Sequence, residues 1–321
     1  MSTAVASRPT SSLTRASGGR KFKNNTATVL VWVSFVVALI PLVWVLWTVI
    51  GSGLSTVVHA SWWTGTMRNI TYTDPGGGAL HAVVGTLEQV AICTVISVPV
   101  AVLVGIYLVE YGRGPFAKVT TFMVDIMTGI PSIVAGLFIY ALVVETFGVS
   151  LSGWLISLAL IILMVPVIVR TTEEILKLVP NELREASYAL GVPKWKTIMK
   201  VVVPTAFSGL VTGVVLGIAR VAGETAPLLI LVSYSDSLNS DPFSGAQGAL
   251  PTLIRSQFSD AGLTASGPSY HLDPVTGQRI AGGAANYAVA RMWGAALTLI
   301  LIVLVLTIIA RLIGRRNKLA K

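Results

Sequence analysis

The feature that most constrains this chain is a set of six long apolar runs. They lie near residues 28–51, 83–108, 118–144, 150–170, 206–232 and 287–313. A helix needs about 20 mainly apolar residues to cross a hydrocarbon core of about 30 Å. Only 12% of the 321 residues are charged and the mean hydropathy is +0.78, whereas a soluble domain carries roughly 25% charged residues. The sequence therefore predicts an all-α integral membrane protein with six transmembrane helices.

Basic residues are unequally distributed among the segments that join these runs. The N-terminal tail, the 109–118 connection, the 170–205 segment and the C-terminal tail together hold 18 of the 23 Lys and Arg residues. Segments rich in Lys and Arg remain on the cytoplasmic side of a membrane. We therefore expect both termini and the 170–205 segment to be cytoplasmic. A nucleic-acid-binding face would not divide its charge in this way, so nucleic acid is not an expected partner despite the net charge of +9.

These boundaries predict a simple domain organisation. Residues 1–27 are expected to be a disordered cytoplasmic tail because Ser, Thr, Ala and Arg dominate them. A transmembrane domain follows at 28–313, with a long extracytoplasmic loop at about 233–286, and a basic cytoplasmic tail at 314–321 ends the chain. Prolines inside the spans predict either irregular packing or a broken helix. The best candidate for a break is the run Gly129-Ile130-Pro131-Ser132, which Gly136 follows.

The segment PNELREASYALGVPKWKTIMKVVVP, residues 180–204, predicts a short helical hairpin on the cytoplasmic membrane surface. Apolar and small residues recur at helical spacing before Gly191, which can end a helix in the left-handed conformation. Val192 and Pro193 then begin a second amphipathic helix. Small residues on the first helix would let a partner approach closely. The alternative is an interfacial hairpin that has no partner.

This segment resembles the coupling loop of binding-protein-dependent ABC importer permeases. That loop reads Glu-Ala-Ala, three residues, Gly, nine residues and an aliphatic-x-aliphatic-Pro ending. The matching residues here are Glu185, Ala186, Ser187, Gly191, Val201, Val203 and Pro204. Ser187 replaces the second alanine of the pattern, which exchanges one small residue for another. The resemblance implies a type I ABC importer permease fold, in which Glu185, Ala186, Ser187 and Gly191 couple the spans to a separate ATPase subunit.

Charged residues inside the apolar runs are the candidates for contact with a solute, since burying a charge in a bilayer is costly. Arg220 and Glu224 are four residues apart in the fifth run, and a continuous helix would place them on one face where they could pair. They form either a structural ion pair or an oxyanion site, because guanidinium matches oxyanions. Arg170 ends the fourth run and either meets the solute or reaches a lipid headgroup.

The sequence around these arginines is similar to that of PstA-type phosphate permeases. Their Pro-x-x-x-Arg-Thr-x-Glu pattern is matched from Pro166 to Glu173, and their Arg-x-x-Gly-Glu-Thr-Ala-Pro pattern from Arg220 to Pro227. The run GIPSIVAGLF at 129–138 is also typical of phosphate permeases. The resemblance implies import of inorganic phosphate across a bacterial cytoplasmic membrane, with Arg220, Arg170 and Glu224 along the substrate pathway.

The same resemblance implies partners. They are a PstC-type permease subunit, two PstB-type ATPase subunits that bind ATP and Mg²⁺, and a PstS-type phosphate-binding protein. The chain has no GxxxxGK[ST] phosphate loop, so we expect it to carry no cofactor, no metal and no catalytic residue of its own. Two alternatives stay open: a permease for another oxyanion such as sulfate or molybdate, and a multispan membrane enzyme or channel.

Overall fold

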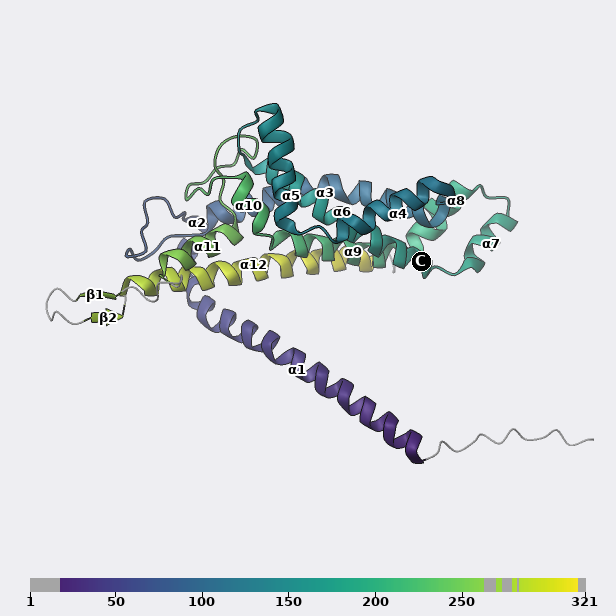
Figure 1. Cartoon of the computed structure of the whole chain (residues 1–321), viewed down its shortest axis with the longest axis horizontal. Helices are drawn as coiled ribbons and strands as arrows, with labels where there is room; N and C mark the ends of the chain where they lie inside the picture. The colour runs from purple at the N-terminus through teal and green to yellow at the C-terminus, as the bar shows by residue number, and fades with distance from the viewer. Residues whose placement is uncertain (1–17, 263–269, 273–278, 282, 317–321) are drawn as a thin grey trace, which may run out of the picture. The chain divides into compact units, whose positions relative to one another are not determined.

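The computed structural model describes residues 18–262, 270–272, 279–281 and 283–316 (Figure 1). Part of the predicted N-terminal tail and most of the predicted C-terminal tail lie outside these residues. The elements in chain order are α1 Gly18–Val57, α2 Ala60–Thr64, α3 Leu80–Ile106, η1 Tyr107–Tyr111, α4 Gly114–Thr128, α5 Ser132–Ile139, η2 Tyr140–Glu145, α6 Gly153–Lys177, α7 Asn181–Ala189, α8 Lys194–Thr197, η3 Ile198–Val202, α9 Val203–Ala222, α10 Ala226–Leu231, α11 Leu250–Asp260, β1 Tyr270–Leu272, β2 Arg279–Ala281 and α12 Gly283–Arg316. The segments η1, η2 and η3 are π-helical.

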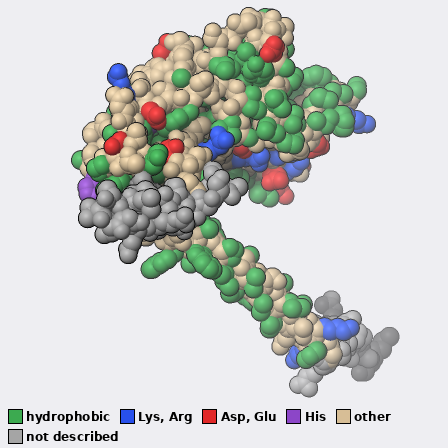
Figure 2. All heavy atoms as spheres, turned by 60° about the vertical axis from the view of Figure 1, so that its left-hand side comes forward, with side chains coloured by type: hydrophobic (Ala, Val, Ile, Leu, Met, Phe, Trp, Pro, Cys, Tyr) green, Lys and Arg blue, Asp and Glu red, His purple; other side chains and the backbone are tan. Residues whose placement is uncertain are grey.

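The chain forms two units, residues 1–48 and 49–321, which divide within α1. In the first unit the structure describes a helical stretch of α1 with strongly exposed apolar side chains. Trp47, for example, is 80% exposed, and Figure 2 shows hydrophobic side chains along this helix. A helix with apolar side chains exposed along its length is suited to contact with lipid.

Among the residues that the structure describes, five helices are long and apolar enough to cross a membrane. They cover Lys21–Val57, Leu80–Tyr111, Gly153–Lys177, Lys194–Ala222 and Tyr287–Leu312. A bent pair, Gly114–Thr128 and Ser132–Glu145, makes a sixth span if its two halves cross together. These helices confirm the predicted all-α membrane fold, to which the structure adds a short antiparallel pair, β1 and β2, inside the 233–286 segment.

Two of the predicted spans are interrupted by prolines. The span expected at 118–144 bends by 107° at the predicted break, because Gly129 ends α4 and Pro131 begins α5. The span expected at 206–232 instead runs from Lys194 to Ala222 and stops. Pro227 is responsible, since it lacks an N–H and its ring clashes with the carbonyl four residues earlier. The short helix α10 then begins afresh after Thr225.

Helix α6 forms the centre of the second unit. Its residues Leu160, Met164 and Ile168 are almost fully buried in a core shared with α3, α9 and α10. Glycine allows close approach here: a Cβ on Gly213 would lie 2.5 Å from Thr171 Cγ2. Small residues serve this purpose where membrane helices pack. The contact also fixes the register between α9 and α6.

The two ends of the second unit carry different elements. Helices α7 and α8 lie at one end and α2 and α11 at the other (Figure 1), and we name these the α7 end and the α11 end. A second core at the α11 end joins α11 to α12 through Leu250, Leu253 and Ala295. The 233–286 segment, predicted as a long loop, therefore contains a helix packed on the bundle.

Candidate functional site

Residues 181–197 form a compact turn of two helices, which we call the α7–α8 hairpin. Helix α7 ends as the sequence predicted, because Gly191 has φ of +75°. Its N–H donates to Tyr188 O at 2.9 Å, and Val192 N–H donates to Ser187 O at 3.2 Å. This pair of bonds is the Schellman motif, which satisfies the free carbonyls at a helix end. The turn between the two helices is thus set by local backbone chemistry.

The residues predicted to couple to an ATPase occupy different positions in this hairpin. Glu185, Ala186 and Gly191 are exposed on its surface. Ser187 is buried, and its Oγ lies 2.8 Å from Thr197 Oγ1 on the second arm. Ser187 therefore holds the two arms together instead of facing outward. The outer surface is also apolar, since Leu183 and Leu190 are exposed, and such a surface suits contact with another subunit.

An ion pair that the sequence analysis missed anchors this hairpin. Arg184 Nη2 lies 2.8 Å from Glu110 Oε1, and the two side chains are only 13% and 5% exposed. The residues are far apart in sequence, so helical spacing gives no sign of the pair. The available signal was the presence of Glu110 at the end of an apolar run, where a buried acid needs a basic partner.

Arg170 lies in α6 and is held by two carboxylates. Its Nη1 donates to Glu173 Oε2 at 2.6 Å, and its Nη2 donates to Asp125 Oδ1 of α4 and to Thr121 O at 3.3 Å. Lys177 Nζ is 4.0 Å from Glu173. The Arg170 side chain is 28% exposed, so it is neither fully buried nor free in solvent.

This Arg170 cluster lines a cavity of about 490 Å³ between α4, α6 and η1. The charged residues on its wall are Lys118, Asp125, Arg170, Glu173 and Lys177. Three positive and two negative groups leave an excess of one positive charge. An anion can enter this cavity, although Asp125 and Glu173 compete with it for the guanidinium of Arg170.

Arg220 and Glu224 do not share a helix face, which corrects the prediction that both lie in one continuous span. Helix α9 ends at Ala222, and Glu224 falls in the break before α10. Within the described residues no salt bridge joins the two, and Arg220 is exposed in the last turn of α9. The expected shared helix face was therefore wrong, and the structural ion pair, one of the two alternatives for these residues, is not formed in the described residues; the reason is the break that Pro227 imposes.

Glu224 instead lines a small cavity of about 10 Å³. Thr86 and Gln89 of α3 contribute to the same wall. Gln89 Nε2 donates to Gln247 Oε1 at 2.9 Å, and Gln247 Nε2 donates to Glu88 Oε2 at 2.6 Å. A polar region therefore lies inside the bundle beside the break that holds Glu224.

The two arginines assigned to the pathway lie at different depths. Thr171, next to Arg170, packs on Gly213 of α9. Arg220 is seven residues beyond Gly213, which corresponds to about 10 Å along a helix axis. The structure thus brings Arg170 together with Asp125 and Glu173, and Glu224 together with Thr86 and Gln89, as two separate polar regions.

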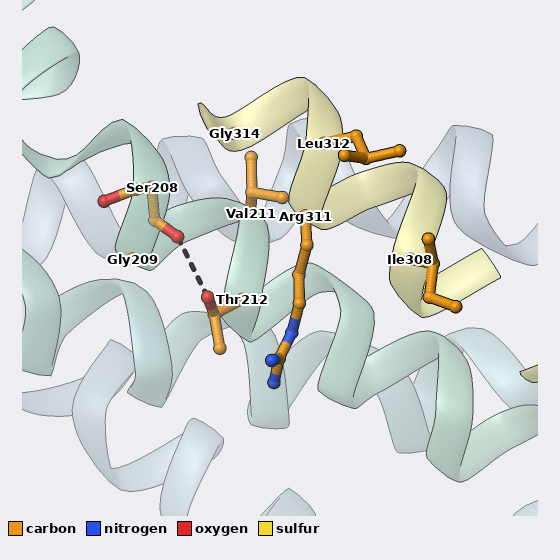
Figure 3. A pocket seen from close by; sticks show the side chains of 8 residues that line it. All are labelled: Ser208, Gly209, Val211, Thr212, Ile308, Arg311, Leu312 and Gly314. Atoms are coloured by element: carbon orange, nitrogen blue, oxygen red, sulfur yellow. Dashed lines mark hydrogen bonds between the residues drawn. The ribbon is translucent and has the colours of Figure 1, made fainter. Parts of the chain in front are cut away.

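A further cavity lies between α9 and α12. It has a volume of about 540 Å³, and Ser208, Thr212 and Arg311 are among its lining residues. Figure 3 shows the Arg311 side chain extending between the helices toward Thr212. The cavity contains none of the residues predicted for the pathway or for coupling. Its position between the first turns of α9 and the last turns of α12 places it toward the α7 end.

At the α11 end, ionised carboxylates hold two turns. Hydrogen bonds from Thr71 Oγ1 and N lower the pKa of Asp74 below its usual 3.8. Bonds from Ser244 Oγ and Phe243 N lower the pKa of Asp241 in the same way. A lowered pKa in the folded state means that this stabilisation is present at neutral pH and is lost as the pH falls through the lowered value.

The buried Arg291 of α12 binds the loop that contains the first of these turns. Its Nη2 donates to Thr71 O at 3.0 Å and its Nη1 to Gly76 O at 3.4 Å. The loop is therefore fastened to α12 as well as ordered by its own carboxylate. Within the described part of the chain, no group of three or more His, Cys, Asp and Glu side chains could hold a metal ion.

Comparison with known proteins defines the class. Residues 97–319 match the family of binding-protein-dependent transport system inner membrane components. The match covers more than half of the chain, so the chain belongs to this family and is a membrane component of a multi-component transport system. The structure is similar to the MetNI methionine ABC transporter in an inward-facing conformation, with a TM-score of 0.51, 21% identity and coverage of 74% of this chain and 94% of that chain. This similarity confirms the predicted ABC importer permease fold.

Curated relatives are more specific. The chain is 47% identical over 294 residues to the phosphate transport system permease protein PstA 1 of Mycobacterium tuberculosis strain CDC 1551, covering 92% of this chain and 89% of the relative. It is 48% identical over 284 residues to PstA of Mycobacterium leprae (88% and 86%) and 41% identical over 236 residues to PstA of Yersinia pestis (73% and 78%). These relatives are named permeases, which agrees with the expectation of a permease subunit and not an enzyme.

Proposed function

We propose that this chain is the permease subunit of an ATP-driven importer and carries inorganic phosphate across a bacterial cytoplasmic membrane by alternating access. The observation that carries the proposal is the 47% identity over 92% of the chain to a relative named as a phosphate transport permease. The Arg-x-x-Gly-Glu-Thr-Ala-Pro sequence gives it a chemical basis. It places Arg220 in the last turn of α9 and Glu224 just beyond the end of that helix, where Glu224 borders a polar region of the bundle.

Arg220 is the residue expected to bind phosphate. Its guanidinium offers a rigid set of N–H donors that matches an oxyanion, and in the described residues no carboxylate pairs with it. Glu224 lies nearby and repels an anion, which favours release. Arg170 is a second binding site along the pathway, where the carboxylates of Asp125 and Glu173 lower the affinity of the guanidinium for the solute.

The proposed assembly contains a PstC-type permease subunit, two PstB-type ATPase subunits and a PstS-type phosphate-binding protein. ATP and Mg²⁺ bind to the ATPase subunits, and this chain carries no cofactor of its own. The exposed residues Glu185, Ala186 and Gly191 of the α7–α8 hairpin meet an ATPase subunit, and Ser187 keeps the hairpin rigid.

The proposed orientation has both termini and the α7 end in the cytoplasm. Supporting it, basic residues from separate segments gather at the α7 end. Lys118 and Lys177 share the cavity beside η1, Arg184 and Lys194 contact Glu110, and Arg311 lies near the start of α9. Cytoplasmic segments carry such an excess of positive charge.

The test is uptake of labelled phosphate by cells that lack this gene, in a host that supplies the partner subunits. Wild-type protein should restore uptake, and excess sulfate should not inhibit the restored uptake. Arg220→Ala protein should restore little or no uptake. Arg255→Ala is the matched control, because Arg255 is an exposed arginine on α11. Failure of the well-expressed wild type to restore uptake would contradict phosphate as the solute. Inhibition by sulfate or molybdate would favour another oxyanion.

A further inference from the structure

Every N–H of the Arg184 guanidinium donates a hydrogen bond. Its Nε and Nη2 donate to Glu110 Oε1 at 3.1 and 2.8 Å, and Nη2 also donates to Leu176 O at 3.1 Å. Nη1 donates to Val179 O at 2.7 Å and to Asn181 Oδ1 at 3.4 Å. Guanidinium has five N–H donors, and these bonds occupy all of them. The side chain thus has one fixed position between α6, α7 and η1.

The second arm of the α7–α8 hairpin is fastened to the same short segment. Lys194 Nζ donates to Glu110 O and lies 4.7 Å from the centre of the Tyr111 ring. The bond between Ser187 and Thr197 joins the two arms. Hence the hairpin moves as one body, and both of its arms are attached to η1 at Glu110 and Tyr111.

The segment η1 continues helix α3, and the two form one span from Leu80 to Tyr111. Thr86 and Gln89, in the other half of this span, line the small cavity beside Glu224. Gln89 is 21 residues from Glu110, about 30 Å along a helix. A single span therefore connects the attachment of the hairpin to the polar region at the break after α9.

We propose that Arg184 and Glu110 are positioning residues that transmit movement of the α7–α8 hairpin to α3 and so to the wall beside Glu224. The hairpin is joined by the peptide chain to α6 and α9, and those helices follow it without further contacts. Helix α3 has no such peptide connection to the hairpin, and the contacts at Glu110 and Tyr111 attach it to the hairpin directly, in addition to its packing on α6. The proposal rests on the proposed function, in which an ATPase subunit displaces the hairpin.

The test uses the complete complex in proteoliposomes and measures phosphate transported per ATP hydrolysed. We expect Glu110→Gln and Arg184→Gln to lower this ratio about fivefold or more, the usual lower range for coupling between sites. Because the two residues act as one contact, the double variant should lower it no further than the worse single variant. Arg184→Lys, which keeps the charge but has three donors, should give an intermediate ratio.

Arg113→Gln is the matched control, because it removes an exposed arginine three residues from Glu110 and should leave the ratio unchanged. A purely structural role would lower the amount of assembled complex, or transport and hydrolysis in parallel, without changing the ratio. An unchanged ratio in Arg184→Gln or in Arg184→Lys complexes would therefore overturn the proposal.

A second readout does not depend on the solute. Spin labels at the exposed residues Leu87 of α3 and Leu229 of α10 report movement of α3 when the complex binds ATP, in a Cys93→Ser background. The distance should change to the same extent in the wild type and in Arg113→Gln, and should change less in Arg184→Gln, where α3 keeps only its packing on α6. An equal change in Arg184→Gln would refute the attachment. Failure of phosphate uptake alone would contradict only the proposed function.

Discussion

In the proposed function Asp125 competes with the solute for Arg170, so removing Asp125 should strengthen the apparent affinity for phosphate. The Asp125 carboxylate pairs with Arg170 Nη2, but its side chain is 58% exposed. Exposed ion pairs contribute about 0.2–1 kcal/mol. Because 1.4 kcal/mol corresponds to a factor of ten, Asp125→Asn should lower the phosphate concentration for half-maximal uptake by about 1.4- to 5-fold.

The assay is the initial rate of labelled-phosphate uptake against phosphate concentration. Glu174→Gln is the control, because Glu174 is an exposed carboxylate next to the cluster. The effect of Asp125→Asn should shrink at high ionic strength, where exposed charges are screened. An unchanged half-saturating concentration, equal to that of Glu174→Gln, would refute the reasoning, because Arg170 would then hold the helices together without meeting the solute.

Two further predictions concern glycines. Gly209→Ala should destabilise the protein by about 1–2 kcal/mol, because the new Cβ would lie 2.5 Å from Ile175 Cγ2. Adding Ile175→Ala to the same chain should recover part of this loss. Gly51→Ala is the control: a Cβ there has nothing within 4 Å, so this variant should stabilise the protein by about 0.5–1 kcal/mol. Thermal unfolding of the purified complex measures the change in stability of Gly209→Ala and of Gly51→Ala. Equal shifts of the unfolding temperature in the two variants would contradict close packing of Gly209 on Ile175. Gly191→Pro should abolish ATPase association or coupling, because proline cannot adopt the φ of +75°; co-purification and uptake measure this, and retention of both would show that the turn is dispensable.

Features set by local chemistry were predictable from the sequence. The long apolar runs predicted the membrane helices, since length and hydropathy are properties of contiguous residues. The left-handed end of α7 followed from Gly191, and the break before α5 followed from Gly129 and Pro131. In each case the cause lies within a few residues of its effect.

Contacts between distant residues were not predictable in the same way. Arg184 and Glu110 are 74 residues apart, and Arg170 and Asp125 are 45 apart. The first pairing depends on how α7 packs on η1 and the second on how α6 packs on α4, which hydrophobic periodicity does not determine. The error over Glu224 is different in kind, because its cause was visible in the sequence. Pro227 is three residues further on, and its effect on the preceding turn should have separated Glu224 from α9.

The two short helices that follow the proline breaks, α5 and α10, meet in space. A Cβ on Gly136 of α5 would lie 3.1 Å from Pro227 Cα of α10, so these two short helices approach at backbone distance. Each helix end leaves N–H or C=O groups without helical partners, and membrane proteins tolerate such ends only where protein or water surrounds them. Transporter folds often place their solute sites at discontinuous helices. Glu224 lies at one of these ends and Arg220 just before it, so the same prolines that interrupt the spans place both residues at the helix break where the proposed function requires a path for an oxyanion.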